Sequence, residues 1–297
     1  MSTAALACGC KVNLGLRITG VREDGYHLLD SLFWPLPEPH DTLEVAARPA
    51  GSGVPGITVR LDADFDPADN TLTKAHAAFA AVVADAPGVD VRLTKRIPMG
   101  AGLGGGSADA ACLLRWLNTQ VAQPLDEDAL VAVALKVGAD CPFFLRNRPC
   151  RVQGIGEIVT PYAGPAPADA RELLLVCPDV SVSTVWAYKR HDELLREQGH
   201  GQGRGLTKPA PAASNHSSFP ADALLVNDLE PAVYGRYPQL ASIKAQLLEL
   251  GARAACMSGS GASILGLFAR GGAQAAQAVF ARQNMRAYAM PLEDAGM

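Results

Sequence analysis

The feature that most constrains the fold is a glycine-rich segment at residues 98–109. It reads Pro-Met-Gly-Ala-Gly-Leu-Gly-Gly-Gly-Ser-Ala-Asp, so five glycines fall within seven residues. The alternating pattern of residues 89–95 predicts a strand before it, and the spacing of Ala110, Leu113 and Leu117 predicts a helix after it. Glycines allow positive φ angles and a close approach to a ligand. Backbone amides at such a junction favour an anion, so the segment predicts a phosphate-binding loop.

This loop differs from two better-known nucleotide motifs. A P-loop has a lysine after its last glycine, whereas Ser107 follows Gly106 here. A dinucleotide fingerprint can be forced onto Gly100, Gly102 and Gly105, but no acidic residue closes a following strand about 20 residues further on. A merely flexible surface loop is the alternative, and the position between a strand and a helix argues against it. We expect Ser107 to cap the helix, where its hydroxyl could reach a phosphate oxygen or magnesium.

Composition limits the other function classes. The chain has 297 residues, 48% of them hydrophobic and 19% charged, enough for two domains with real cores. The net charge is -4 and the basic stretches are short, which argues against nucleic-acid binding. We expect no secretory signal, and no apolar run approaches the ~20 residues of a membrane span. We therefore expect a cytoplasmic protein, with no membrane contact and no obligate protein partner.

The seven cysteines are odd in number and dispersed along the chain. Cys8 and Cys10 are separated by one residue, which is not the spacing of a zinc or redox site. We expect reduced thiols that pack as small hydrophobic groups.

Strands and helices mix along the chain without a regular βαβ rhythm. This order predicts an α+β protein of two layers rather than a doubly wound sheet. A turn around Pro35, Pro37 and Pro39 separates two of the strands. Predicted strands cover residues 10–18, 28–36, 42–46, 57–61, 89–95, 173–177, 254–258, 264–269 and 287–290. Predicted helices cover residues 70–84, 126–137, 184–196, 223–234, 238–250 and 273–282, besides the one after the glycines.

Two loops divide this pattern. The least organised stretch, residues 160–170, predicts domains at 1–160 and 161–297. Residues 199–218 form a polar Gly/Pro/Ser stretch that we expect to be a mobile loop.

Lys11 and Asp140 are candidates for a catalytic pair. Lys11 shares one face of its strand with Asn13, opposite the apolar residues, although such a lysine is most often just solvated. Asp140 follows a helix that ends near Gly138, its expected C′ residue, and an aspartate there usually forms a turn. Phosphoryl transfer to an alcohol needs a phosphate cradle, a cation and a carboxylate near the hydroxyl. A cation beside that carboxylate would keep it ionised.

A second small-residue turn lies at residues 257–263, with the sequence Met-Ser-Gly-Ser-Gly-Ala-Ser. It can be a tight hairpin between strands, or a place where the backbone approaches a ligand closely. The residues alone favour neither interpretation.

Three of these segments together resemble the GHMP kinase family, which includes galactokinase, homoserine kinase and mevalonate kinase. They are the lysine-bearing first strand, the loop at 98–107 and the turn at 258–262. Further segments resemble the branch of this family that phosphorylates a cytidine diphosphate-linked methylerythritol on the non-mevalonate route to isoprenoid precursors. These segments are residues 11–14, 20–27, 104–109, 137–143, 154–157 and 227–230.

The resemblance implies a fold and an ATP site. The fold would be an N-terminal domain like ribosomal protein S5 domain 2 and a ferredoxin-like C-terminal domain. ATP would be bound with Mg2+, for which Ser107 is the candidate ligand. The residues implied for ATP are Pro98, Met99, Gly100, Ala101, Gly102, Leu103, Gly104, Gly105, Gly106, Ser107 and Ala108.

The resemblance also implies roles at the substrate. Asp140 would be the base toward the substrate hydroxyl, and Lys11 would keep it ionised. Asn13 would contact the same part of the substrate. Tyr26 and His27 would hold the cytosine. Tyr188 would close over it, with core packing as the alternative for this side chain.

Two departures from the family pattern stand out. Cys8-Gly-Cys10 precedes Lys11 where the family usually has Ala-Pro-Ala. Ala108 follows Ser107 where a second serine is usual, so one hydroxyl is missing. The alternatives are another GHMP kinase, acting on homoserine or a mevalonate-type alcohol, and a catalytically silent nucleotide-binding module.

Overall fold

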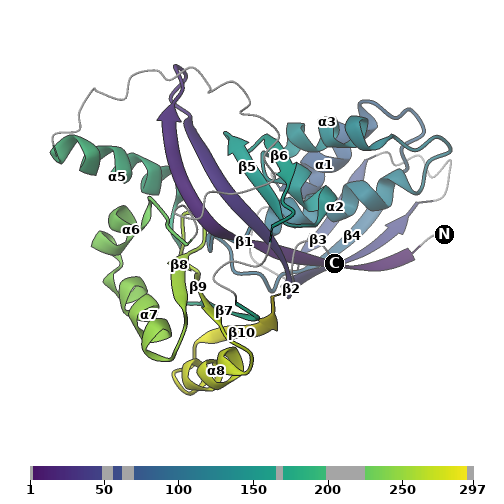
Figure 1. The fold of residues 1–297 in the computed structure, drawn as a ribbon. Coiled ribbons are helices and arrows are strands. Elements are labelled where there is room, and N and C mark those ends of the chain that lie inside the picture. Colours follow the sequence, from purple (N-terminus) through teal and green to yellow (C-terminus); the bar gives the residue numbers. More distant parts are fainter. Residues whose placement is uncertain (1–2, 49–55, 62–69, 165–169, 199–224, 293–297) are drawn as a thin grey trace. The chain divides into compact units, whose positions relative to one another are not determined.

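The computed structural model describes residues 3–48, 56–61, 70–164, 170–198 and 225–292 (Figure 1). These residues form two compact units, each built from separate stretches of chain. Unit 1 consists of the described residues within Met1–Cys10, Pro35–Pro98 and Gly104–Asn147. Unit 2 consists of the described residues within Lys11–Trp34, Met99–Leu103 and Arg148–Met297. The domain boundary between residues 160 and 161 stays a prediction. The loop expected at 199–218 and the start of the helix expected at 223–234 lie outside the described residues.

Two long strands, β1 (Thr3–Val21) and β2 (His27–Ala47), pair with each other and contribute residues to both units. The prediction of two strands with a turn at Pro35, Pro37 and Pro39 was wrong, because β2 is continuous. Its residues 29–33 pair with β5 and its residues 42–47 pair with β4. The three prolines fall between these registers, where a missing N–H breaks neither ladder.

Unit 1 places helices beside short strands. β3 (Ile57–Leu61) runs parallel to β4 (Val89–Thr94), and β4 runs antiparallel to the end of β2. The helices are α1 (Thr71–Ala80), α2 (Gly105–Asn118), α3 (Glu127–Val137) and α4 (Cys141–Arg146). Asn70 and Asp126 cap α1 and α3 by accepting the N–H of Thr73 and Ala129. Helix α2 contacts α1, α3 and α4.

The end of α3 differs from its expected form. Gly138 is the C-cap residue with a φ of 178°, which is extended backbone. It is therefore not the left-handed C′ glycine that the sequence suggested. Helix α4, which the sequence analysis missed, begins three residues later and contains the buried Phe143 and Phe144.

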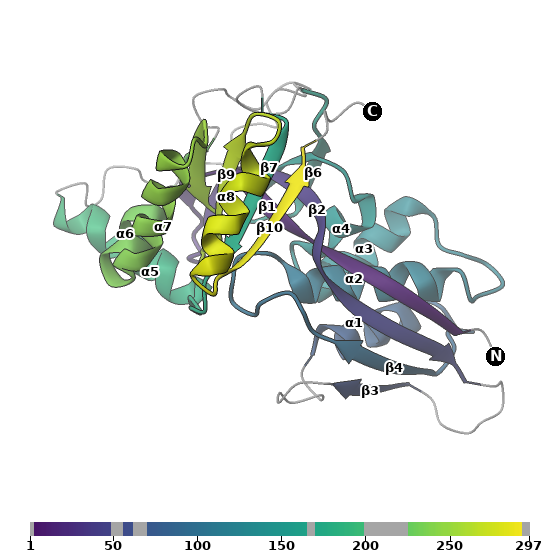
Figure 2. The same ribbon diagram turned by 90° about the horizontal axis from the view of Figure 1, so that it is seen from below.

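Unit 2 holds a four-stranded antiparallel sheet in the order β10-β7-β9-β8. Its strands are β7 (Glu172–Cys177), β8 (Ala254–Met257), β9 (Ile264–Phe268) and β10 (Arg286–Pro291). Its helices are α5 (Thr184–Glu197), α6 (Glu230–Arg236), α7 (Pro238–Glu249) and α8 (Gly272–Arg282). Helix α8 packs on β7, β9 and β10, and α7 packs on β8 and β9 (Figure 2).

The same unit contains two strands that the sequence analysis missed. β5 (Cys150–Gly154) pairs antiparallel with the start of β2, and β6 (Ile158–Pro161) pairs antiparallel with β5.

All seven cysteines are free and buried, as the sequence predicted. Within the described ranges, no three His, Cys, Asp or Glu side chains group so that they could hold a metal ion. No helix in the described part of the chain is long and apolar enough to cross a membrane.

Candidate active site

Lys11 is buried in the middle of β1, with only 4% of its surface exposed. Its ammonium group donates to Asn13 Oδ1 at 2.7 Å and to the Gly102 carbonyl at 3.0 Å. It also lies 4.5 Å from the centre of the Phe33 ring. A buried charge is costly unless it is hydrogen-bonded, so these contacts hold the ammonium group in one place. The shared face of Lys11 and Asn13 is confirmed, and the solvated alternative for Lys11 was wrong.

Asn13 is held on several sides. Its Nδ2 donates to Ser31 Oγ at 2.8 Å, and its backbone N–H donates to Ser258 Oγ at 3.2 Å. Ser31 Oγ in turn donates to the Gly15 carbonyl at 2.5 Å. Because the amide nitrogen faces Ser31, the amide oxygen is the atom that faces Lys11.

The first half of the glycine-rich loop packs on these residues within unit 2. Gly100 and Gly102 have φ angles of 64° and 76°. The Gly102 carbonyl accepts from Lys11 Nζ and also from Ser258 Oγ at 3.1 Å. Backbone bonds join Lys11 N–H to the Leu103 carbonyl and Ser263 N–H to the Ala101 carbonyl. The loop is thus tied to β1 and to the turn after β8.

That turn connects β8 and β9, which pair as an antiparallel hairpin. The hairpin interpretation of residues 257–263 is therefore confirmed. The turn lies close to the backbone of Gly102. The other interpretation, that the turn also lies close to a bound ligand, stays a prediction.

We expect Gly102→Ala to destabilise the protein and to reduce turnover. A Cβ at Gly102 would overlap the Ser258 carbonyl oxygen, and the φ angle is one that side chains disfavour. Strain of this kind costs about 1–3 kcal/mol. Gly251→Ala is the matched control, because Gly251 has a φ of 95° but open space around it. Thermal unfolding of both variants measures the effect, and equal losses would show that the contact with Ser258 is unimportant.

The second half of the loop belongs to unit 1 and begins α2. The N-cap of α2 is Gly104, with a φ of 71° and no side-chain cap, so the expected cap by Ser107 was wrong. Ser107 lies in the first turn of the helix instead. The first N–H groups of a helix have no partner inside it, so these amides suit a phosphate oxygen.

Asp140 also lies in unit 1, as the N-cap residue of α4, where it is partly exposed and its side chain does not cap the helix. The next residue, Cys141, has its thiol hydrogen-bonded to Ser107, and burial raises the pKa of this thiol to about 12. The start of α2 and the residue after Asp140 are thus brought together. The pairing of Asp140 with Lys11 stays a prediction.

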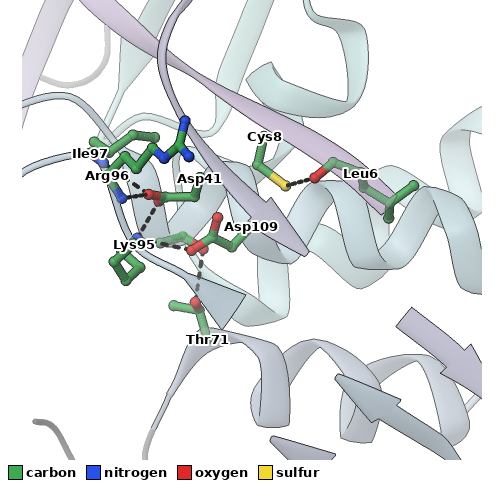
Figure 3. Close-up of polar contacts among 9 residues, drawn as sticks. Leu6, Cys8, Asp41, Thr71, Lys95, Arg96, Ile97 and Asp109 are labelled. Carbon is green, nitrogen blue, oxygen red and sulfur yellow. Dashed lines mark hydrogen bonds and ion pairs between the residues drawn. The ribbon is translucent and has the colours of Figure 1, made fainter. Parts of the chain in front are cut away.

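Figure 3 shows a buried ion cluster of Lys95, Asp41 and Asp109 that the sequence analysis missed. The Lys95 ammonium contacts Asp41 and, at 3.0 Å, Asp109. Asp41 Oδ1 accepts the backbone N–H of Arg96 at 2.6 Å and of Ile97 at 2.8 Å. Lys95 precedes the glycines and Asp109 follows them, so the cluster fixes both ends of the segment within unit 1.

Burial and neighbouring charges act in opposite directions on the pKa values of Asp109 and Lys95. Burial raises the pKa of Asp109 to about 7, although Lys95 pulls it down. Burial opposes the charge on Lys95, but Asp109 and Asp41 outweigh it and raise the pKa of Lys95. Asp109, two residues after Ser107, is the one sequence feature from which this ion cluster could have been predicted. Nothing in the spacing indicated Asp41 as its neighbour.

The residues expected at a cytosine are partly brought together. The rings of His27 and Tyr188 lie 4.8 Å apart at 35°. His27 Nε2 is 2.8 Å from Asp192 Oδ1, a contact that the sequence analysis missed. Tyr26 is 61% exposed, and Tyr188 is partly buried against the core of unit 2. Tyr188 therefore combines core packing with a contact to His27.

Comparison with known proteins identifies the family. The GHMP kinases N terminal domain matches residues 70–148, and the GHMP kinases C terminal domain matches residues 211–287. A 4-diphosphocytidyl-2-C-methyl-D-erythritol kinase of Nitratidesulfovibrio vulgaris is 47% identical over 266 residues, 89% of this chain and 90% of its own. The protein of that name from Lawsonia intracellularis is 41% identical, over 90% and 89% of the two chains.

Solved structures agree. The crystal structure of a 4-(cytidine 5'-diphospho)-2C-methyl-D-erythritol kinase has a TM-score of 0.74 and 30% identity, and covers 98% of this chain and 99% of its own. A homoserine kinase from Cytophaga hutchinsonii has a TM-score of 0.70 at 18% identity, covering 100% and 96%, which shows the shared fold alone. The expected two-domain α+β kinase fold is confirmed. This chain belongs to the GHMP kinases and, within them, to the 4-diphosphocytidyl-2-C-methyl-D-erythritol kinase family.

Proposed function

We propose that this kinase transfers the γ-phosphoryl group of ATP to the 2-hydroxyl of 4-diphosphocytidyl-2-C-methyl-D-erythritol. The reaction belongs to non-mevalonate isoprenoid precursor biosynthesis. The observation that carries the proposal is the 47% identity, over nine-tenths of both chains, to a kinase of that name. The contact between His27 and Tyr188 supports a site for a flat base, since stacking is worth about 1–3 kcal/mol per base.

We assign the chemistry of phosphoryl transfer to Asp140, Lys11 and Asn13. Asp140 accepts the proton of the substrate hydroxyl, and Lys11 supplies the positive charge that keeps Asp140 ionised. Asn13, whose amide oxygen faces Lys11, contacts the same end of the substrate. The buried, doubly hydrogen-bonded ammonium of Lys11 supports this, because a fixed charge needs no rearrangement during transfer.

The ATP phosphates fit the glycine-rich segment. The left-handed glycines and the uncapped start of α2 leave amides and open backbone for phosphate oxygens. Residues 98–108 are the proposed ATP-binding residues. Mg2+ keeps several waters and takes few protein ligands, so we assign the Ser107 hydroxyl as the protein group that would hold it beside the phosphates. Bound Mg2+ would neutralise charge on the phosphates.

We also propose that Tyr26, His27 and Tyr188 hold the cytosine end of the substrate. Tyr26 is exposed and so is available to a ligand. We infer that the protein acts in the cytoplasm on a small molecule, without nucleic acid, membrane or an obligate protein partner.

A coupled ADP-release assay tests the reaction. ATP and Mg2+ are supplied with 4-diphosphocytidyl-2-C-methyl-D-erythritol, homoserine or mevalonate in parallel. We expect turnover only with the cytidine compound, and we expect CMP to raise the melting temperature of the protein. Turnover with another alcohol would keep the kinase and overturn the cytosine site. The absence of turnover with all three would favour a silent nucleotide-binding module.

A further inference from the structure

Asn227 is a buried side chain of unit 2, 4% exposed, to which the mechanism above gives no task. Its Nδ2 donates to the carbonyls of Met257 and Gly259, both at 2.7 Å. Its Oδ1 accepts the N–H of Leu229 at 2.9 Å. Both amide hydrogens and the amide oxygen are thus engaged, and all three partners are backbone groups.

The backbone around Asn227 runs beside β1. Leu225 N–H donates to the Leu14 carbonyl at 2.7 Å, and Leu16 N–H donates to the Val226 carbonyl at 2.8 Å. Asp228 N–H donates to the Leu16 carbonyl at 3.0 Å. Residues 225–228 are therefore fixed to the strand that carries Lys11 and Asn13.

Between the two carbonyls that Asn227 holds lies Ser258. The Ser258 hydroxyl accepts the N–H of Asn13 and donates to the Gly102 carbonyl. The Gly102 carbonyl is also the acceptor of the Lys11 ammonium. A movement of the Ser258 backbone would therefore displace both the Gly102 carbonyl and Asn13, which accept the hydrogen bonds of the Lys11 ammonium group.

We propose that Asn227 is a positioning residue for Lys11. It clamps the carbonyls on both sides of Ser258, and Ser258 sets the place of Asn13 and Gly102, between which the ammonium group is held. The proposal rests on the proposed role of Lys11 in phosphoryl transfer.

Asn227→Asp tests this role with almost no change of shape. It replaces the donating NH2 by an oxygen that faces two carbonyl oxygens, so the turn should shift. A displacement of about 1 Å can cost about 10²-fold in rate. We expect kcat to fall on the order of 10-fold to 10²-fold, with the KM values for ATP and the cytidine substrate within about 3-fold.

Asp228→Asn is the matched control. Among the described residues, the hydrogen bonds of the Asp228 carboxylate go to Arg17 and to the N–H of Ile18 rather than to the turn, so we expect the kcat of this variant to stay within about 2-fold. Ser258→Ala removes the hydroxyl that links the turn to Asn13 and to the Gly102 carbonyl. The double variant Asn227→Asp/Ser258→Ala should lose no more than the worse single variant, because both act through one path.

A second readout follows Lys11 directly. After brief acetylation and peptide mapping, Lys11 should be labelled several-fold faster in Asn227→Asp than in the wild type or Asp228→Asn. This readout does not depend on turnover, so it tests the proposal even if the substrate assignment fails. Wild-type inactivity on the cytidine substrate would overturn only the proposed function.

Three results would overturn the role of Asn227. They are a kcat within about 2-fold of wild type, a loss of kcat no larger than the loss of folded protein, and unchanged labelling of Lys11.

Discussion

Asp140→Asn is expected to lower kcat by about 10²–10⁴-fold, the usual contribution of a general base. Asparagine has the shape of aspartate but cannot take up the proton of the substrate hydroxyl. The side chain of Asp140 makes no cap to α4, so its replacement removes no helix cap. Nucleotide binding should survive, because the proposed ATP residues lie at 98–108. The measurements are kcat from ADP release and the shift in melting temperature with an ATP analogue.

Asp126→Asn provides the control for this substitution. Asp126 lies in the same unit and caps α3, a role that asparagine fills equally well, so activity should be unchanged. Near-normal turnover of Asp140→Asn would show that another group takes the proton. A joint loss of turnover and nucleotide binding would instead make Asp140 part of the ATP site.

Local pattern predicted most of the elements, and its failures have physical causes. Alternation located the strand of Lys11 and placed Asn13 on the same face, because successive residues in a strand point to opposite sides. The prolines of β2 suggested a turn, since proline lacks the N–H of a ladder. The structure shows that these prolines lie between two ladders, a fact that only the pairing partners reveal.

The site was harder to foresee than the fold. The acceptors of Lys11 and Asn13 lie far away in the sequence, Gly102 by 91 positions and Ser258 by 245. Spacing along one strand cannot indicate such partners. The contact between His27 and Asp192 spans 165 positions and was missed for the same reason. Resemblance to a family supplied residues at these places but not their contacts.

The second large effect concerns stability. Lys95→Met is expected to lower the free energy of unfolding by about 3–5 kcal/mol, the usual cost of breaking a buried ion pair from one side. Asp41 and Asp109 are buried at 0% and 2% exposure, and the variant removes the ammonium that contacts both. Such a loss is a large part of the 5–15 kcal/mol free energy of unfolding that is typical of a folded protein. Urea unfolding of wild type and variant measures it. Lys136→Met, at an exposed lysine of α3, should cost at most about 0.5 kcal/mol.

Asp109→Asn shows whether charge causes this loss. The double variant Lys95→Met/Asp109→Asn should be more stable than the sum of the two single losses predicts, because only one buried carboxylate is then left without its cation.

The pH dependence of the unfolding free energy is an independent test of the charge on Asp109. Because burial raises the pKa of Asp109 to about 7, the folded state binds this proton more tightly than the unfolded chain. The stabilisation is complete below pH about 4 and is lost as the pH rises through about 7.

The unfolding free energy of wild type, relative to Asp109→Asn, should therefore fall between pH about 4 and about 8. In Lys95→Met the cation that lowers the pKa of Asp109 is gone, so the fall should move to higher pH. Parallel curves for wild type and Asp109→Asn would show that Asp109 takes up no proton on folding. Since the cluster fixes both ends of the phosphate loop, the same titration should also appear in the KM for ATP, which a purely global loss of stability would leave unchanged below the melting temperature.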